Sequence, residues 1–157
     1  MPEGKDPEII IDSSSIIALY KLNLIEILKD LYTAVTVPEA VLSEVGHDLP
    51  HWIKIVPVDH IKEEVQEFSN KLGDGESEVI TLGIEKENDV LVLDDLRARQ
   101  AAKKLGLKIT GLLGVLLKAK RRKKISKIRP LLEILDKENF RISTGLKNEI
   151  LEIAGEI

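Results

Sequence analysis

The 157-residue chain is 43% hydrophobic and 32% charged with a formal net charge of −4, which is typical of one soluble globular domain and excludes a disordered chain. No apolar run approaches the ~20 residues that span a bilayer, the N-terminal segment has no apolar signal sequence, and cysteine is absent. We therefore expect a cytoplasmic protein without membrane contact, disulfides or thiolate-bound metals.

Short β-branched runs alternate with segments of helical periodicity along the first two thirds of the chain. The β-branched runs predict strands and the amphipathic segments predict helices. In chain order the expected elements are a strand at 8–12, a helix at 16–32, a strand at 33–37, a helix at 38–45, a strand at 53–58, helices at 60–71 and 76–88, a strand at 90–93, a helix at 96–106 and a strand at 107–110. From Gly111 onward the chain is expected to be helical, with breaks before Pro130 and near Ser143.

This alternation of strands and helices predicts the fold class. Consecutive parallel strands are joined by right-handed crossovers through helices, so we expect an α/β/α sandwich with a mostly parallel central sheet. No repeat, linker or low-complexity segment interrupts residues 1–157, which favours a single domain. In such sheets ligands bind beyond the carboxyl ends of the strands, and that edge is where functional residues are expected.

Acidic residues stand at this edge. Asp12 ends the first predicted strand, Asp94 and Asp95 end the fourth, and Glu44 and Glu76 lie on helices that follow strands or turns. Crowded carboxylates raise one another's pKa and destabilise a fold unless a hard cation such as Mg²⁺ or Mn²⁺ binds them. A set of acids without histidine or cysteine therefore predicts metal-assisted hydrolysis of a phosphodiester.

Structural roles are the alternative for each acid taken singly. Asp12, Asp94 and Asp95 stand where side chains cap helices, and Glu76 stands in a first helical turn, where the helix dipole favours an acid. Capping is the commoner role for any one of them, but the position of both predicted caps at the ligand edge favours a site. A zinc site is not expected, because the three histidines lack the spacing of a zinc motif.

Four segments of the chain resemble the PIN-domain nucleases, and the branch related to the VapC-type toxins is the most similar. The likeness extends over about residues 8–155, and the segments are IIIDSSSIIAL, VPEAVLSEV, LGDGESEVITLG and VLVLDDLRARQAAKKLGLKITGLLGVLLKAK. The resemblance implies a PIN-like α/β/α sandwich and cleavage of single-stranded RNA with Mg²⁺ or Mn²⁺. It also implies a small antitoxin partner and a homodimer, as in many members of that branch.

The resemblance also implies roles for individual residues. Its metal-binding acids match Asp12, Glu76 and the Asp94/Asp95 pair, and Glu44 matches a further catalytic acid. Motif spacing favours Asp95 over Asp94 as the principal ligand. Two neighbours of the metal site are implied as well. Ser14 lies close to the metal, and Arg99 pairs with the acids or contacts a phosphate. Two departures from the family pattern are Leu93 in place of a threonine and a glutamate at position 76 where many relatives have aspartate.

A basic stretch, residues 118–129 (KAKRRKKISKIR), is expected to be helical and holds eight of the 23 basic residues and no acid. Arg121, Arg122, Lys123 and Lys124 at its centre are candidates for binding RNA phosphates. The solvated face of a helix explains the stretch equally well, because no aromatic residue is interleaved to stack bases.

The sequence thus predicts a metal-dependent endoribonuclease that is the toxin of a toxin–antitoxin pair. In the expected mechanism Asp12, Glu76 and the Asp94/Asp95 pair hold the metal, and a water assisted by Glu44 attacks phosphorus in line. The alternative is a catalytically inactive PIN-like module that binds RNA or protein. A phospho-acceptor domain of the response-regulator type is disfavoured, because Gly111 stands where that class needs a lysine after the last strand.

Overall fold

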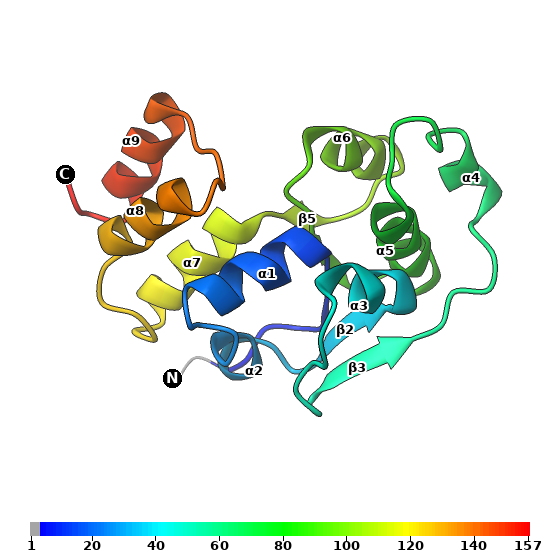
Figure 1. Ribbon diagram of the computed structural model, residues 1–157, viewed down its shortest axis with the longest axis horizontal. Coiled ribbons are helices and arrows are strands. Elements are labelled where there is room, and N and C mark those ends of the chain that lie inside the picture. The colour runs from blue at the N-terminus through cyan, green and yellow to red at the C-terminus, as the bar shows by residue number, and fades with distance from the viewer. Residues whose placement is uncertain (1–3) are drawn as a thin grey trace.

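The computed structural model describes residues 4–157, and at its centre these residues form a five-stranded parallel sheet (Figure 1). The strands are β1 (Ile9–Ile11), β2 (Val35–Pro38), β3 (Ile53–Val56), β4 (Val90–Val92) and β5 (Ile109–Thr110). Their order is β3-β2-β1-β4-β5, and every neighbouring pair is parallel. The predicted strands and the predicted fold class, an α/β sandwich around a parallel sheet, are confirmed.

The strand order reverses between β1 and β4, and this reversal positions the candidate site. From β1 the chain proceeds outward to β2 and β3 and then crosses back to β4 on the other side of β1. Helices that follow the two central strands diverge from such a point, which opens a crevice beyond the strand ends. Ile11 at the end of β1 pairs with Val92 at the end of β4, so the residues after both strands lie at the same edge.

The helices cover the sheet, and the last of them in the chain extend the molecule beyond it at one end. They are α1 (Ser13–Lys21), α2 (Ile27–Leu31), α3 (Glu39–Val45), α4 (Glu63–Gln66), α5 (Asp74–Glu85), α6 (Leu96–Lys104), α7 (Leu112–Arg121), α8 (Arg129–Lys137) and α9 (Thr144–Ile153). Figure 1 shows α8 and α9 beyond α7, at the opposite end of the molecule from α4. None of the helices between residues 4 and 157 is long and apolar enough to cross a membrane.

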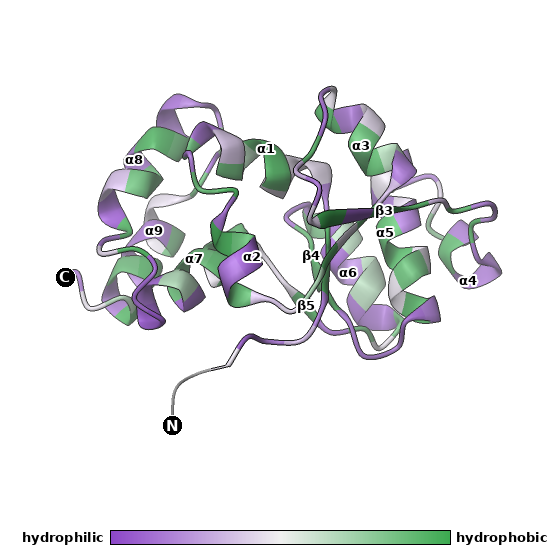
Figure 2. Cartoon of the chain, turned by 90° about the horizontal axis from the view of Figure 1, so that it is seen from below, coloured by the Kyte–Doolittle hydropathy of each residue, from purple (hydrophilic) through white to green (hydrophobic). Residues whose placement is uncertain are grey.

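The core explains the uninterrupted apolar strands. Ile9, Ile10 and Ile11 are fully buried, because β1 is central and helices cover both of its faces. Figure 2 shows apolar residues on the strands and on parts of most helices, whereas hydrophilic residues gather on outer turns. Burial of this kind, at ~25 cal/mol per Å² of apolar surface, supplies the main force that holds the layers together.

Two predicted helices are wrong in extent. The expected helix at 16–32 is two helices, because the chain turns after Lys21 and Asn23 takes a left-handed conformation with φ of 60°. Asparagine tolerates that conformation, and the turn lets the apolar residues of α1 and α2 face the core from different directions. The expected helix at 60–71 is only one turn, α4, because the residues that follow it form turns up to Gly73.

The basic stretch is also less helical than expected. Helix α7 ends at Arg121, Lys123 has a φ of 61°, and the chain is non-helical until α8 begins at Arg129. The break expected before Pro130 is confirmed, since that proline stands in the first turn of α8, where its missing N–H costs nothing. Residues 118–129 therefore consist of a helix end and a turn, and not of one basic helical face.

Candidate active site

Asp12 and Asp94 meet at the crevice between the two central strands. The backbone N–H of Asp12 donates to the carbonyl oxygen of Val92 (3.0 Å), which continues the ladder between β1 and β4 by one residue. The backbone N–H of Asp94 then donates to Oδ2 of Asp12 (2.9 Å). Asp12 is only 3% exposed, so this carboxylate is held inside the crevice by the ends of both strands.

Asp12 is also a helix cap. It precedes α1 with an extended backbone, and its Oδ1 accepts the N–H of Ser15 (3.0 Å). Asp12 therefore caps α1 and also belongs to the candidate site. Burial, together with the negative charge of Asp94, raises the pKa of Asp12 from its ordinary 3.8 to about 6. A carboxylate with a raised pKa beside a second carboxylate is an arrangement that a positive charge would stabilise.

Three consecutive serines donate their hydroxyls to three different acids. Ser13 Oγ donates to Oε1 of Glu44 (2.8 Å), Ser14 Oγ to Oδ2 of Asp12 (3.4 Å), and Ser15 Oγ to Oδ2 of Asp94. Successive residues of a helix are rotated by about 100°, so three hydroxyls in the first turn of α1 point in three directions. Of these serines only Ser14 was predicted to be a site neighbour. Their place in the turn after Asp12 was the one local indication that all three reach the site.

Asp94 is held from a second side by the start of α7. Its Oδ1 accepts the N–H of Leu112 (3.0 Å), an N-terminal donor of that helix. A Cβ atom at position 111 would lie 3.2 Å from Oδ1 of Asp94 and 2.9 Å from Nη1 of Arg99, so Gly111 is the residue that leaves room for both side chains. Arg99 donates from Nη1 to the carbonyl oxygen of Leu93 (2.8 Å) and forms no ion pair with any acid between residues 4 and 157.

Glu44 and Glu76 border the crevice from α3 and α5. Oε2 of Glu44 accepts the N–H of Gly75 (3.2 Å), and Oε1 of Glu76 accepts the N–H of Gly73 (2.8 Å). Burial raises the pKa of Glu76, and the charges of Asp95 and Glu44 add to that effect. A Cβ atom at position 75 would lie 2.2 Å from Oε1 of Glu44, so glycine is needed for this approach of α3 and α5.

The two adjacent aspartates at the end of β4 have different surroundings. Asp94 is half-buried and bonds to Asp12, Ser15 and Leu112, as described above. Asp95 is exposed and caps α6, since its Oδ2 accepts the N–H of Ala98 (3.0 Å). Its electrostatic neighbour is Glu76. Asp94 is thus the aspartate in direct contact with Asp12, whereas Asp95 is close to Glu76.

The five acids predicted from the sequence therefore lie near the carboxyl ends of β1 and β4 in two groups. Asp12 and Asp94 form the inner group, and Glu44, Glu76 and Asp95 form the outer group. As the side chains of residues 4–157 are arranged, no three or more of Asp, Glu and His are gathered closely enough to hold one ion jointly. Serine hydroxyls and backbone N–H groups are the donors that these carboxylates bind.

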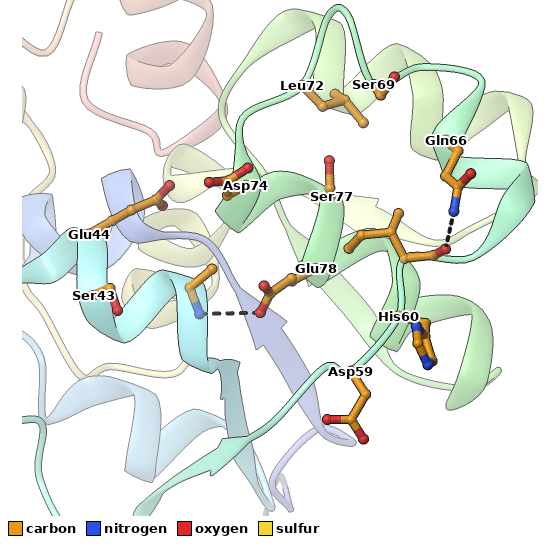
Figure 3. A pocket seen from close by; sticks show the side chains of 12 residues that line it. Ser43, Glu44, Asp59, His60, Gln66, Ser69, Leu72, Asp74, Ser77 and Glu78 are labelled. Atoms are coloured by element: carbon orange, nitrogen blue, oxygen red, sulfur yellow. Dashed lines mark hydrogen bonds between the residues drawn. The ribbon is translucent and has the colours of Figure 1, made fainter.

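A cavity of about 610 Å³ adjoins the outer group. Figure 3 shows it between α3, α5 and the chain around α4, with Glu44 and Asp74 at one side and Asp59 and His60 at the other. Glu78 lies on its wall and accepts the backbone N–H of Ala40 (3.2 Å). The lining contains several acids and neither lysine nor arginine, so its field repels a phosphate group.

Half of the eight basic side chains of the basic stretch, those of Lys118, Lys120, Arg122 and Arg129, are bonded within the fold. Lys118 and Arg122 both pair with Asp6, and Lys120 pairs with Glu156 (2.7 Å). Glu156 also accepts the N–H groups of Ile128 (2.7 Å) and Arg129 (3.0 Å), which closes the turn between α7 and α8. These contacts tie both ends of the described chain to α7. Among the four residues named as RNA-binding candidates, Arg121, Lys123 and Lys124 are exposed and Arg122 is half-buried against Asp6.

A family model described as PIN domain matches residues 8–156 of the chain, which is nearly its whole length. A comparison with curated proteins found no match. The resemblance to PIN-domain proteins is thereby confirmed, whereas the likeness to the VapC-type branch stays a prediction. PIN domains are typically nucleases, and in this chain Asp12 and Asp94 follow the paired ends of β1 and β4. This chain belongs to the PIN-domain family.

Proposed function

We propose that the protein is an endoribonuclease that cleaves single-stranded RNA with the help of Mg²⁺ or Mn²⁺. The observation that carries the proposal is the buried contact between Asp12 and Asp94 at the point where the strand order reverses. Burial of one carboxylate beside another is unfavourable and is selected against unless the charge is used. Three further acids, Glu44, Glu76 and Asp95, form a neighbouring group, and the chain has no cysteine that would favour a softer metal.

The residues present fit a hard divalent ion. All candidate ligands are carboxylate oxygens, and each carboxylate has about four acceptor positions, so the hydrogen bonds of Asp12 and Asp94 leave further positions for an ion. We assign Asp12 and Asp94 as its principal ligands, with Asp95 and Glu76 as the other acids that hold it. When bound, the ion would supply the positive charge that activates a water and stabilises a phosphodiester in the transition state.

The side chains around the pair have supporting roles. The hydroxyls of Ser14 and Ser15 fix the rotamers of the two inner acids, since each donates to one of them. Glu44 is exposed at the crevice and is positioned to accept a proton from the attacking water at its carboxylate. Arg99, whose guanidinium lies beside Gly111 and donates to the carbonyl oxygen of Leu93, supplies a positive charge near Asp94 that can contact a phosphate.

A cleavage assay with matched variants tests the proposal. Wild-type protein and the Asp12→Asn, Asp94→Asn and Asp48→Asn variants are incubated with labelled single-stranded RNA, with Mn²⁺, with Mg²⁺ or with chelator. Asp48 is exposed and is not among the acids of the proposed site, so Asp48→Asn controls for the loss of one negative charge. We expect metal-dependent cleavage by wild type and Asp48→Asn and none by the other two. Undiminished cleavage by Asp12→Asn would refute the mechanism, and RNA binding without cleavage by wild type would favour the inactive binding module.

The proposed biological role is that of a toxin with a small protein antitoxin, acting as a homodimer. The support is the sequence likeness to the VapC-type branch in the segments around Asp12 and Asp94. Expression of wild-type protein should stop bacterial growth, and Asp12→Asn should relieve the arrest. Sedimentation of the purified protein measures whether it is a dimer. Normal growth during expression of an active nuclease would remove the toxin role and leave the enzymatic proposal intact.

A further inference from the structure

A second cavity, of about 440 Å³, is lined by residues of α6 and of the chain that leads from α4 to α5. Its volume falls within the ~300–1,000 Å³ of typical ligand pockets. Basic side chains and one aromatic ring dominate its walls, and the residues concerned are Phe68, Lys71, Arg97, Gln100, Lys103 and Lys104. None of them belongs to the acid groups of the crevice or to the basic stretch.

The cations of this groove are not neutralised by the protein. Lys71, Arg97, Lys103 and Lys104 form no ion pair and no side-chain hydrogen bond with any residue from 4 to 157. In the basic stretch, by contrast, Lys118 and Lys120 are paired with Asp6 and Glu156. Four like charges around one groove repel one another and raise the local concentration of anions. The groove is therefore suited to an anionic ligand.

The shape of the groove favours an extended anion. Arg97, Gln100, Ala101 and Lys104 recur at helical spacing and share one face of α6. With a rise of ~1.5 Å per residue, Arg97 and Lys104 are about 10 Å apart along the axis, too far for one phosphate to bridge. Phe68 is half-buried on the opposite wall and presents an aromatic ring to the same space. A line of cations beside an aromatic ring is the chemistry that binds a single nucleic acid strand.

Both walls of the groove lead to the acids of the crevice. Helix α6 begins immediately after Asp95, and the chain that contains Phe68 continues through Gly73 into α5, which carries Glu76. Asp95 and Glu76 are close enough to interact electrostatically, so the two elements that form the walls meet the outer acid group at the start of α6 and in the first turn of α5. The larger cavity, whose lining includes Glu44, has no lysine or arginine in that lining and repels phosphate.

We infer that the groove between α6 and residues 67–72 binds the backbone of single-stranded RNA and guides it to the carboxylates. Arg97, Lys103, Lys104 and Lys71 contact phosphates, and Phe68 stacks on a base. This inference rests on the proposed function for the nature of the strand, and it places the main RNA contacts on α6 and not on the basic stretch.

The test measures RNA affinity without cleavage. Fluorescence anisotropy of a labelled single-stranded RNA is recorded in chelator at several salt concentrations, for wild type and two double variants. Arg97→Gln/Lys104→Gln removes two charges from the groove, and Arg121→Gln/Lys123→Gln removes two exposed charges from the basic stretch as a matched control. The groove variant should lower the slope of log K against log salt by about 1.4, or ~0.7 per contact, while the control keeps the wild-type slope.

A third variant tests the aromatic contact. Phe68→Leu retains apolar packing and should weaken binding by about fivefold or more if a base stacks on the ring. Circular dichroism melting establishes that each variant is folded. An unchanged slope in the groove variant, equal weakening by both double variants, or no RNA binding by wild type would each overturn the inference.

Cleavage by the same proteins separates this inference from the proposed function. Wild type that binds RNA through the groove but does not cleave it with Mn²⁺ refutes the nuclease and leaves the groove intact. Wild type that cleaves, together with a groove variant that cleaves with an unchanged KM, refutes the groove and leaves the nuclease intact.

Discussion

Replacing Asp12 by asparagine in metal-free protein should change how stability depends on pH. In the folded protein burial and the charge of Asp94 raise the pKa of Asp12 to about 6 from an ordinary value of 3.8. The folded state therefore binds the proton more tightly than the unfolded chain does. Protonated Asp12 therefore stabilises the folded state fully below pH 3.8, and this stabilisation is lost as the pH rises through 6. Each pH unit between the two pKa values is worth ~1.4 kcal/mol, so the loss by pH 8 is about 3 kcal/mol.

The asparagine side chain has a cost of its own that does not depend on pH. Asp12 uses two oxygens to accept the N–H groups of Ser15 and Asp94, whereas asparagine offers one oxygen and one NH₂ group. One backbone donor loses its acceptor, at a cost of ~1–3 kcal/mol. Asp12→Asn should accordingly be less stable than wild type near pH 4 and should equal or exceed it near pH 8.

Urea unfolding followed by circular dichroism between pH 4 and pH 8 measures this difference. We expect the free energy of unfolding of Asp12→Asn minus that of wild type to rise by about 2.5 kcal/mol over the interval, since a small part of the loss occurs below pH 4. Asp48→Asn serves as the control for loss of one exposed carboxylate. A difference that stays constant with pH would refute the claim that ionised Asp12 is buried against a second negative charge.

Three further predictions concern the metal, the crevice and the C-terminal helices. Saturating Mn²⁺, at ~100 times its Kd, should stabilise wild type by about 2.7 kcal/mol and raise its Tm by ~5–10 °C in a thermal melt, and it should not affect Asp12→Asn. Gly75→Ala places a Cβ atom 2.2 Å from Oε1 of Glu44, so it should displace that flexible carboxylate and lower cleavage by about 10²-fold while the Tm changes by only a few degrees. Burial raises the pKa of Glu156, but bonds from Lys120 and two backbone N–H groups outweigh it and lower the pKa to about 2. The stabilisation from ionised Glu156 is present above pH 4.5 and is lost as the pH falls toward 2. Glu156→Gln should therefore lower the free energy of unfolding by ~1–3 kcal/mol at pH 7. It should also remove that part of the acid sensitivity in pH-dependent melts.

Local patterns accounted for most of the fold. Strands β1 and β4 are short apolar runs, and each ends at an aspartate that caps or precedes the next helix, so both were predictable from consecutive residues. The helix predicted at 16–32 failed because its apolar periodicity continues through the turn at Asn23, and periodicity alone does not reveal a left-handed residue. The helix predicted at 60–71 is wrong in extent: it ends at Gln66 and residues 67–71 form turns, in which Phe68 still packs against the core.

The sequence predicted which residues belong to the candidate site but not which of them contact one another. The acids Asp12, Glu44, Glu76, Asp94 and Asp95 follow from strand ends and from the family likeness, yet the contact of Asp94 with Asp12 needs the pairing of β1 with β4. Motif spacing favoured Asp95, whose side chain caps α6 in the structure. The ligand assignment among these acids remains a prediction for the metal-binding assays.

The sequence by itself determined which segments are strands, which edge of the sheet carries acids and where the positive charges lie along the chain. Only the tertiary structure decided which charges are neutralised. Lys118 and Lys120 look free in the sequence, but Asp6 and Glu156 pair with them from more than 30 positions away. The cations near Phe68 look scattered and yet share one groove. Periodicity and capping act over a few residues, whereas ion pairs and grooves depend on how distant elements pack, and that packing is set by the order of strands in the sheet.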